Sequence, residues 1–265
     1  MSTASPGKWG DLAARSLSAV IMVLFGFTAI WQGGDVFHVA VAAICGVMMW
    51  ELVQMVHPDK SNLSLILGGV AAAALFVASY VPLLTATPFL IVPALAGALL
   101  LPRYKRVFAL FAAAALVAGY AMVAVRDHLG LDWMIWLVLV VVATDIMGYF
   151  AGRVIGGPKF WPRISPKKTW SGTIGGWIGA AVVGWGFATI SGAPMGIIWF
   201  SVLIAVASQF GDISESAIKR AVGVKDSSRL IPGHGGVLDR FDGMMGASLL
   251  VLATGLLFRF PPELV

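Results

Sequence analysis

Long apolar segments recur along the whole chain, and they constrain the fold more than any other feature of the sequence. A membrane-spanning helix needs about 20 mostly apolar residues. Segments that meet this requirement lie at residues 15–32, 36–56, 63–81, 83–101, 106–126, 133–152, 173–191, 194–219 and 241–260. The pattern therefore predicts an all-α integral membrane protein, a polytopic bundle of about nine transmembrane helices.

The composition agrees with a lipid environment. Charged residues make up 12% of the chain and hydrophobic residues 59%, with a mean hydropathy of +0.90. A soluble domain has about 25% charged residues, so a chain this apolar could not cover its surface in water. The net charge of +5 would suggest nucleic acid in a soluble protein. In a membrane protein, basic residues mark cytoplasmic loops, and we expect no nucleic-acid partner.

The basic residues also predict the topology. If the N-terminus is cytoplasmic, sixteen of the eighteen Lys and Arg residues fall in cytoplasmic segments, and Arg126 and Arg259 fall outside. This bias favours a multi-pass protein of the cell (inner) membrane whose polar loops face the cytoplasm. Lys8 and Arg15 before the first apolar run resemble a signal peptide, but we expect an uncleaved first helix because further spans follow.

Polar residues divide the chain into two regions. Residues 145–242 contain six of the thirteen acidic residues and ten of the eighteen basic ones. We therefore predict N-terminal scaffold helices at residues 1–132. A catalytic region is expected at residues 133–265, with two cytoplasmic loops at 153–172 and 219–240.

Asp145 lies within the sixth predicted span, and Asp212 and Glu215 lie within the eighth. An ionisable group near the centre of a span costs at least about 2.5–3.5 kcal/mol and is usually functional. Asp145 and Asp212 each lie roughly 10–12 Å from the basic end of their helix. We expect both to converge below the cytoplasmic face. The eighth segment carries one polar helical face, made of Ser208, Asp212, Glu215, Ser216 and Lys219. The alternative for this face is a seam of interhelical hydrogen bonds.

The two polar loops have the composition of phosphate sites. Lys167, Lys168, Thr169 and Ser171 precede the seventh span, where hydroxyls, ammonium groups and free amides could hold an anion. Ordinary anchoring by a lysine pair is the alternative.

In the second loop, basic residues alternate with carboxylates. The basic residues suit phosphates, and the carboxylates suit Mg²⁺. His234 lies beside Gly235 and Gly236, where the backbone can approach a ligand closely. Asp239 and Asp242 could instead cap the start of the ninth helix. Together the two loops suggest phosphoryl or nucleotidyl transfer at the membrane surface.

The run from Ser216 to Asp242, SAIKRAVGVKDSSRLIPGHGGVLDRFD, resembles the signature of the phosphatidate cytidylyltransferases, also called CDP-diacylglycerol synthases. The motifs SPKKTW at Ser165–Trp170, DxxxYxxGR at Asp145–Arg153 and QFGD at Gln209–Asp212 are also similar to family motifs. The resemblance is close in the second half of the chain. One departure is Ser171, where many relatives have Glu.

The resemblance implies that CTP and phosphatidic acid react to give CDP-diacylglycerol and pyrophosphate for phospholipid biosynthesis. It implies dependence on Mg²⁺, with a second cation as an option, and a homodimer as one arrangement. Implied catalytic residues are Asp212, Asp239, Lys219, Lys225, Arg240 and His234. Implied substrate-binding residues are Lys167, Lys168, Thr169, Ser171, Ser216, Arg220, Asp226, Gly235 and Gly236. Implied metal ligands are Asp212 and Asp239 first, then Asp145, Asp242 and Glu215.

Three other classes of protein remain as alternatives. A transporter would carry charges at mid-span in broken helices, whereas these charges cluster toward one face. A non-catalytic scaffold would have no use for carboxylates at matched depth. A dolichol or phytol kinase-like enzyme is the nearest catalytic alternative, and it would convert CTP to CDP rather than release pyrophosphate.

Overall fold

The computed structural model describes residues 8–261 and residue 264, with side chains from Ala14 onward. Within these residues it contains nine helices long and apolar enough to cross a membrane, which confirms the predicted number. They are α1 (Lys8–Gln32), α2 (Gly34–Val56), α3 (Ser61–Ala78), α4 (Leu83–Leu100), α5 (Lys105–Ala124), α6 (Leu131–Val154), α7 (Trp170–Ser191), α8 (Ile197–Val222) and α9 (Leu238–Phe258). A short π-helix, Val125–Leu129, joins α5 to α6.

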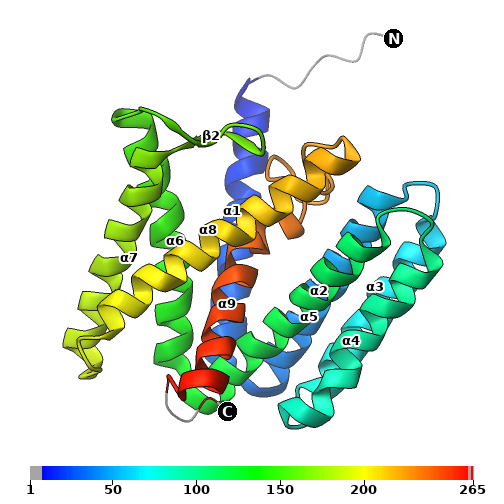
Figure 1. The fold of residues 1–265 in the computed structure, drawn as a ribbon, viewed down its shortest axis with the longest axis horizontal. Coiled ribbons are helices and arrows are strands. Elements are labelled where there is room, and N and C mark those ends of the chain that lie inside the picture. Colours follow the sequence, from blue (N-terminus) through cyan, green and yellow to red (C-terminus); the bar gives the residue numbers. More distant parts are fainter. Residues whose placement is uncertain (1–7, 262–263, 265) are drawn as a thin grey trace.

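The loops between the helices differ in polarity at the two ends of the bundle. Figure 1 shows the start of α1, the strand β2 and the loop between α8 and α9 at one end, and the C-terminus at the other. The loops that join α2 to α3 and α4 to α5 also lie at the first end. All five basic segments of the sequence therefore gather at one end, as the predicted alternation of spans requires.

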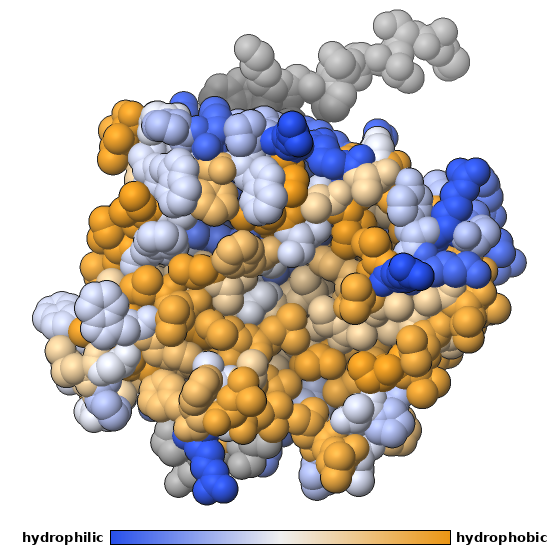
Figure 2. Space-filling model, in the orientation of Figure 1, coloured by the Kyte–Doolittle hydropathy of each residue, from blue (hydrophilic) through white to orange (hydrophobic). Residues whose placement is uncertain are grey.

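The outer surface between the two ends is apolar. Large hydrophobic side chains such as Leu84, Leu110 and Ile190 are 74–89% exposed. In Figure 2 hydrophobic residues form a broad band, with hydrophilic residues gathered along the upper edge. Exposed apolar surface on this scale is unfavourable in water but suits contact with lipid.

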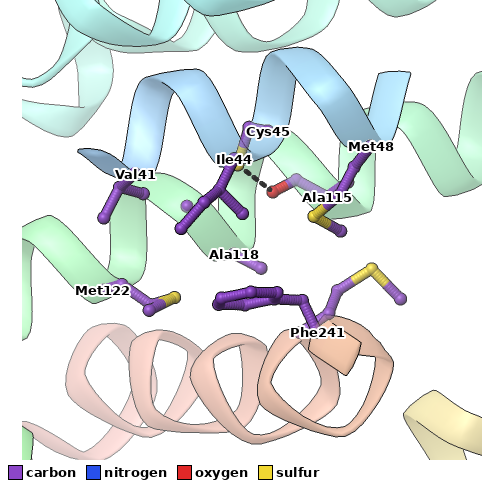
Figure 3. A pocket seen from close by; sticks show the side chains of 10 residues that line it. Val41, Ile44, Cys45, Met48, Ala115, Ala118, Met122 and Phe241 are labelled. Atoms are coloured by element: carbon purple, nitrogen blue, oxygen red, sulfur yellow. Dashed lines mark hydrogen bonds between the residues drawn. The ribbon is translucent and has the colours of Figure 1, made fainter. Parts of the chain in front are cut away.

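Helix α9 packs against α2 and α5, and this packing sets its rotation. Figure 3 shows Phe241 of α9 directed into the gap between these two helices, near Ile44 and Ala118. The remaining cavity of about 20 Å³ is lined almost entirely by apolar atoms. Because Phe241 is held in this gap, the neighbouring acidic residues of α9 turn toward α8.

Helices α8 and α9 are in backbone contact through two glycines. A Cβ atom on Gly211 would lie 2.1 Å from the carbonyl oxygen of Asp242, and one on Gly246 would lie 2.1 Å from that of Ala207. Such distances leave no room for a methyl group, so the glycines allow the site helices to approach closely.

We expect Gly211→Ala to force α8 and α9 apart and to lower the apparent melting temperature, at a cost of about 1–3 kcal/mol or more. Thermal unfolding of the detergent-solubilised protein measures this effect. Gly186→Ala on α7 is the matched control, because no atom lies within 4 Å of its added Cβ. Equal melting temperatures for the two variants would contradict this packing argument.

The two polar loops differ in detail from the predicted ones. Strands β1 (Lys159–Trp161) and β2 (Ser165–Thr169) form an antiparallel hairpin within the first loop, which the sequence analysis did not predict. Helix α8 extends to Val222 and α9 begins at Leu238, so the second loop spans residues 223–237 rather than 219–240. Lys219, Arg220, Asp239 and Arg240 are therefore helical residues.

Candidate active site

A cavity of about 360 Å³ lies between α6, α7, α8 and the hairpin. Asp145 of α6 and Asp212 of α8 both line it, which confirms that these two carboxylates converge. Basic and small polar residues complete the lining, among them Arg153, Lys167, Lys168, Thr169 and Gln209. The first loop and the carboxylates of two spans thus line one cavity.

Ion pairs and hydrogen bonds orient Asp212. The ammonium nitrogen of Lys168 lies 2.5 Å from Asp212 Oδ2. Ser216 donates a hydrogen bond of 3.3 Å to Asp212 Oδ1 from the next turn of α8. One turn earlier, Gln209 donates to the carbonyl oxygen of Thr173 and accepts from Trp177 Nε1. Helices α7 and α8 are therefore connected beside the carboxylate.

A second charged group lies between α8 and α9. The ammonium group of Lys219 contacts Glu215 one turn before it on α8, and lies 2.6 Å from Asp239 Oδ1 on α9. Glu215 is fully buried, and Asp239 has a side chain that is 6% exposed. One lysine therefore pairs with two carboxylates from different helices.

Asp239 also organises the second loop. Its Oδ2 atom accepts hydrogen bonds from the backbone amides of Ser227 (2.9 Å) and Gly236 (2.7 Å) and from the Ser227 hydroxyl (2.9 Å). Gly235, with φ of +82°, would place a Cβ atom 2.7 Å from the same oxygen. Both oxygens of Asp239 are thus engaged, and the loop is folded around them.

Glu51 of α2 holds the other side of this loop, and it was not among the site residues predicted from the sequence. It is fully buried and accepts hydrogen bonds from the hydroxyls of Ser227 and Ser228 and from the amides of Val237 and Leu238. The one available signal was an acidic residue near the end of an apolar segment. Its partners lie 176–187 residues away in the sequence, so no local pattern identifies them.

Asp242 lies within electrostatic range of both charged groups. Its negative charge is repelled by Asp212, Asp145 and Glu215 and attracted by Lys219. Arg240 interacts with Asp145. Among the described side chains, this carboxylate group contains five acids, Asp145, Asp212, Glu215, Asp239 and Asp242. Its cations are Lys168, Lys219 and Arg240.

This arrangement fits a divalent cation. If all eight side chains are charged, the carboxylate group carries a formal excess of two negative charges. Within the described residues, no three acidic, histidine or cysteine side chains are close enough to surround a metal ion by themselves. Mg²⁺ is usually held by one or two carboxylates together with water and substrate phosphates. The donor set therefore fits Mg²⁺ that arrives with a phosphate ligand.

The remaining predicted residues lie around this centre. Thr169 caps α7 by accepting a hydrogen bond from the Gly172 amide, and Ser171 donates to the Gly156 carbonyl. His234 Nδ1 lies 2.9 Å from the Ser18 hydroxyl of α1, and its carbonyl oxygen accepts from Arg240 Nε. The side chains of Arg220, Lys225 and Asp226 are exposed at the polar end.

The chain matches one protein family over nearly its whole length. The profile of the Cytidylyltransferase family matches residues 13–258. A phosphatidate cytidylyltransferase from Brucella abortus is 35% identical over 264 residues, which cover 96% of this chain and 97% of the relative. The enzyme of the same name from Helicobacter pylori is 43% identical over 135 residues, half of each chain. That from Bacillus subtilis is 40% identical over 122 residues, 45% of each chain. The chain therefore belongs to the cytidylyltransferase family.

Proposed function

We propose that the protein transfers the cytidylyl group of CTP to phosphatidic acid, giving CDP-diacylglycerol and pyrophosphate. The names of its relatives support this reaction. The observation that carries it is that two acids of the carboxylate group, Asp145 and Asp212, meet the basic hairpin in one cavity of a transmembrane bundle. A phosphate on a lipid and the phosphates of a nucleotide can meet in such a cavity.

In the proposed reaction, a phosphate oxygen of the lipid attacks the α-phosphorus of CTP. The bond between the α-phosphorus and the oxygen that leads to the β-phosphate breaks, and pyrophosphate leaves with the bonding electrons. The attacking phosphate is anionic at neutral pH, so the reaction needs no strong general base. Catalysis rests on alignment of the phosphates and neutralisation of their charge.

The basic residues are proposed to hold phosphates. Lys167 and Lys168 line the cavity beside Asp212, where their ammonium groups can pair with nucleotide oxygens. Arg240, Lys225 and Arg220 lie at the polar end near the second loop and would bind the departing pyrophosphate or the lipid phosphate. His234 would keep the loop folded through its contacts with Ser18 and Arg240.

The carboxylate group would hold Mg²⁺, with Asp212 and Asp239 as the principal ligands and Asp145, Asp242 and Glu215 nearby. Lys168 and Lys219 now pair with these two aspartates. Mg²⁺ would therefore take the place of these ammonium groups beside the two carboxylates. When held by these residues, Mg²⁺ would supply neutralisation of the charge that develops on the phosphates.

We further propose that the polar end with the two loops faces the cytoplasm and that the N-terminus lies on the same side. The gathering of the basic residues at that end supports this orientation. The cytoplasm is also where CTP is available. We also propose a bacterial inner-membrane location, which the bacterial relatives and the nine apolar helices of the described residues support. A homodimer stays a prediction from the family resemblance.

Two labels on CTP test the reaction. Purified protein in detergent with phosphatidic acid and Mg²⁺ should transfer label from the α-phosphorus of CTP, but not from the γ-phosphorus, into the lipid fraction. Chelation of the metal with EDTA should abolish the transfer, and excess Mg²⁺ should restore it. Transfer of the γ-label to lipid would identify a kinase instead. Protein that is folded but moves neither label would refute the proposal.

A further inference from the structure

The carboxylate of Glu51 connects the N-terminal helices to the site. Each oxygen accepts one backbone amide and faces one hydroxyl, and the single proton of Ser227 Oγ is shared between Glu51 and Asp239 Oδ2. Oε1 accepts from Ser228 Oγ (2.6 Å) and the Val237 amide (2.9 Å). Oε2 accepts from Ser227 Oγ (3.2 Å) and the Leu238 amide (2.7 Å). A fully buried carboxylate is costly unless it is hydrogen-bonded in this way.

Glu51 supplies the N-terminal cap that α9 lacks in its own sequence. The cap position is Val237, which has no side-chain oxygen and makes no capping hydrogen bond of its own. The first amides of a helix have no partner within the helix and carry partial positive charge. Glu51 of α2 accepts hydrogen bonds from two of them and adds negative charge where the helix dipole favours it.

The same contacts fix the distance between Glu51 and Asp239. The Ser227 hydroxyl lies within hydrogen-bonding distance of both carboxylates, 3.2 Å from Glu51 Oε2 and 2.9 Å from Asp239 Oδ2. Between them Gly236 leaves no free space, because a Cβ atom there would lie 2.4 Å from Glu51 Oε1 and 2.0 Å from Ser227 Oγ. A continuous buried network therefore runs from α2 through the loop to Asp239 and Lys219.

We infer that Glu51 is a positioning residue for the reaction. It holds the start of α9, and thereby Asp239, Arg240 and Asp242, in register with Lys219 and Glu215 of α8. Its catalytic consequence rests on the proposed function, but its effect on the loop does not. A role in packing alone would be served by an apolar side chain, whereas four converging donors require an acceptor.

Glu51→Gln tests the inference with little change in shape. The NH₂ group of Gln would face the backbone N–H of Val237 or Leu238, and that N–H would lose its hydrogen-bond acceptor. We expect hydrogen exchange to rise about tenfold in peptides that cover residues 227–238, the effect of losing one buried acceptor. Peptides from α3, α4 and α7 should keep their exchange rates. We expect kcat for lipid labelling to fall about 100-fold, as for a misplacement of about 1 Å.

Gln54→Ala is the matched control. Gln54 lies one turn along α2 and donates to Ser64, away from the second loop. This variant should exchange and react as the wild type does. Ser228→Ala, which removes a single hydroxyl from Glu51, should show the same local effect to a smaller extent. The effect of Ser228→Ala on hydrogen exchange and kcat should be smaller in the Glu51→Gln background than in the wild type, because both changes act on one network.

Two results would overturn the inference. One is a Glu51→Gln protein with wild-type exchange over residues 227–238 or with kcat within about twofold of wild type. The other is faster exchange in every helix together with a matching fall in melting temperature, which would assign Glu51 to general stability. A wild-type protein that labels no lipid would refute the proposed function, while the exchange measurement would still test Glu51.

Discussion

Asp239→Asn should lower kcat for CDP-diacylglycerol formation by roughly 10³-fold. Asp239 is the point at which the second loop, Lys219 and the start of α9 meet. Its Oδ1 faces an ammonium group and its Oδ2 faces three N–H and O–H donors. The amide group of Asn would have to point at one of these donors, so either the lysine or the loop would lose its partner. The α-labelled CTP assay measures the loss.

Asp59→Asn is the control for this variant. Asp59 is an exposed acid at the same polar end, in the turn between α2 and α3. The substitution removes the same charge from the protein without changing the carboxylate group, and the kcat of this variant should match that of the wild type. If Asp239→Asn kept more than about a tenth of the wild-type kcat, Asp239 would be outside the reaction centre.

Lys219→Met should have the largest effect on stability. The lysine is the cation between Glu215, which is fully buried, and Asp239, whose side chain is 6% exposed. Removal of one partner from a buried ion pair costs about 3–5 kcal/mol, because the remaining charge is left without compensation. Here two carboxylates would be left. We expect a clear fall in apparent melting temperature together with loss of activity, and Lys60→Met at an exposed position should leave both unchanged.

A second substitution separates this electrostatic cause from loss of side-chain packing. Adding Glu215→Gln to Lys219→Met removes one of the two unpaired carboxylates and should recover part of the lost melting temperature. The activity should stay low. If the double variant melted at or below the temperature of Lys219→Met, the charge of Glu215 would not be the reason for the instability.

The sequence was sufficient to predict the helices, because membrane spans depend on local composition. All nine predicted spans overlap observed helices, and the convergence of Asp145 with Asp212 followed from their similar depth. The ends of the helices were less accurate. Asp239 and Arg240 start α9 instead of ending a loop, because Glu51 caps this helix from a distant segment.

The interior of the site was harder to predict, since it depends on contacts between distant segments. The family resemblance implied a catalytic role for Lys219, and in the structure it pairs with Glu215 and Asp239. Glu51 and Ser18 lie in predicted scaffold helices and yet contact the second loop. The strand pairing of the hairpin depends on a register that a short polar sequence specifies weakly.

Direct measurement of cation binding tests the central claim that the carboxylate group binds a divalent metal ion together with CTP. Mn²⁺, detected by electron paramagnetic resonance, would be titrated into the purified protein with CTP and without lipid, after subtraction of the signal from Mn²⁺ and CTP alone. Mn²⁺ should bind to the wild-type protein and be displaced by Mg²⁺, and its affinity should be at least about tenfold weaker in Asp212→Asn and Asp239→Asn. Equal Mn²⁺ affinity in the wild type and both variants would contradict the claim.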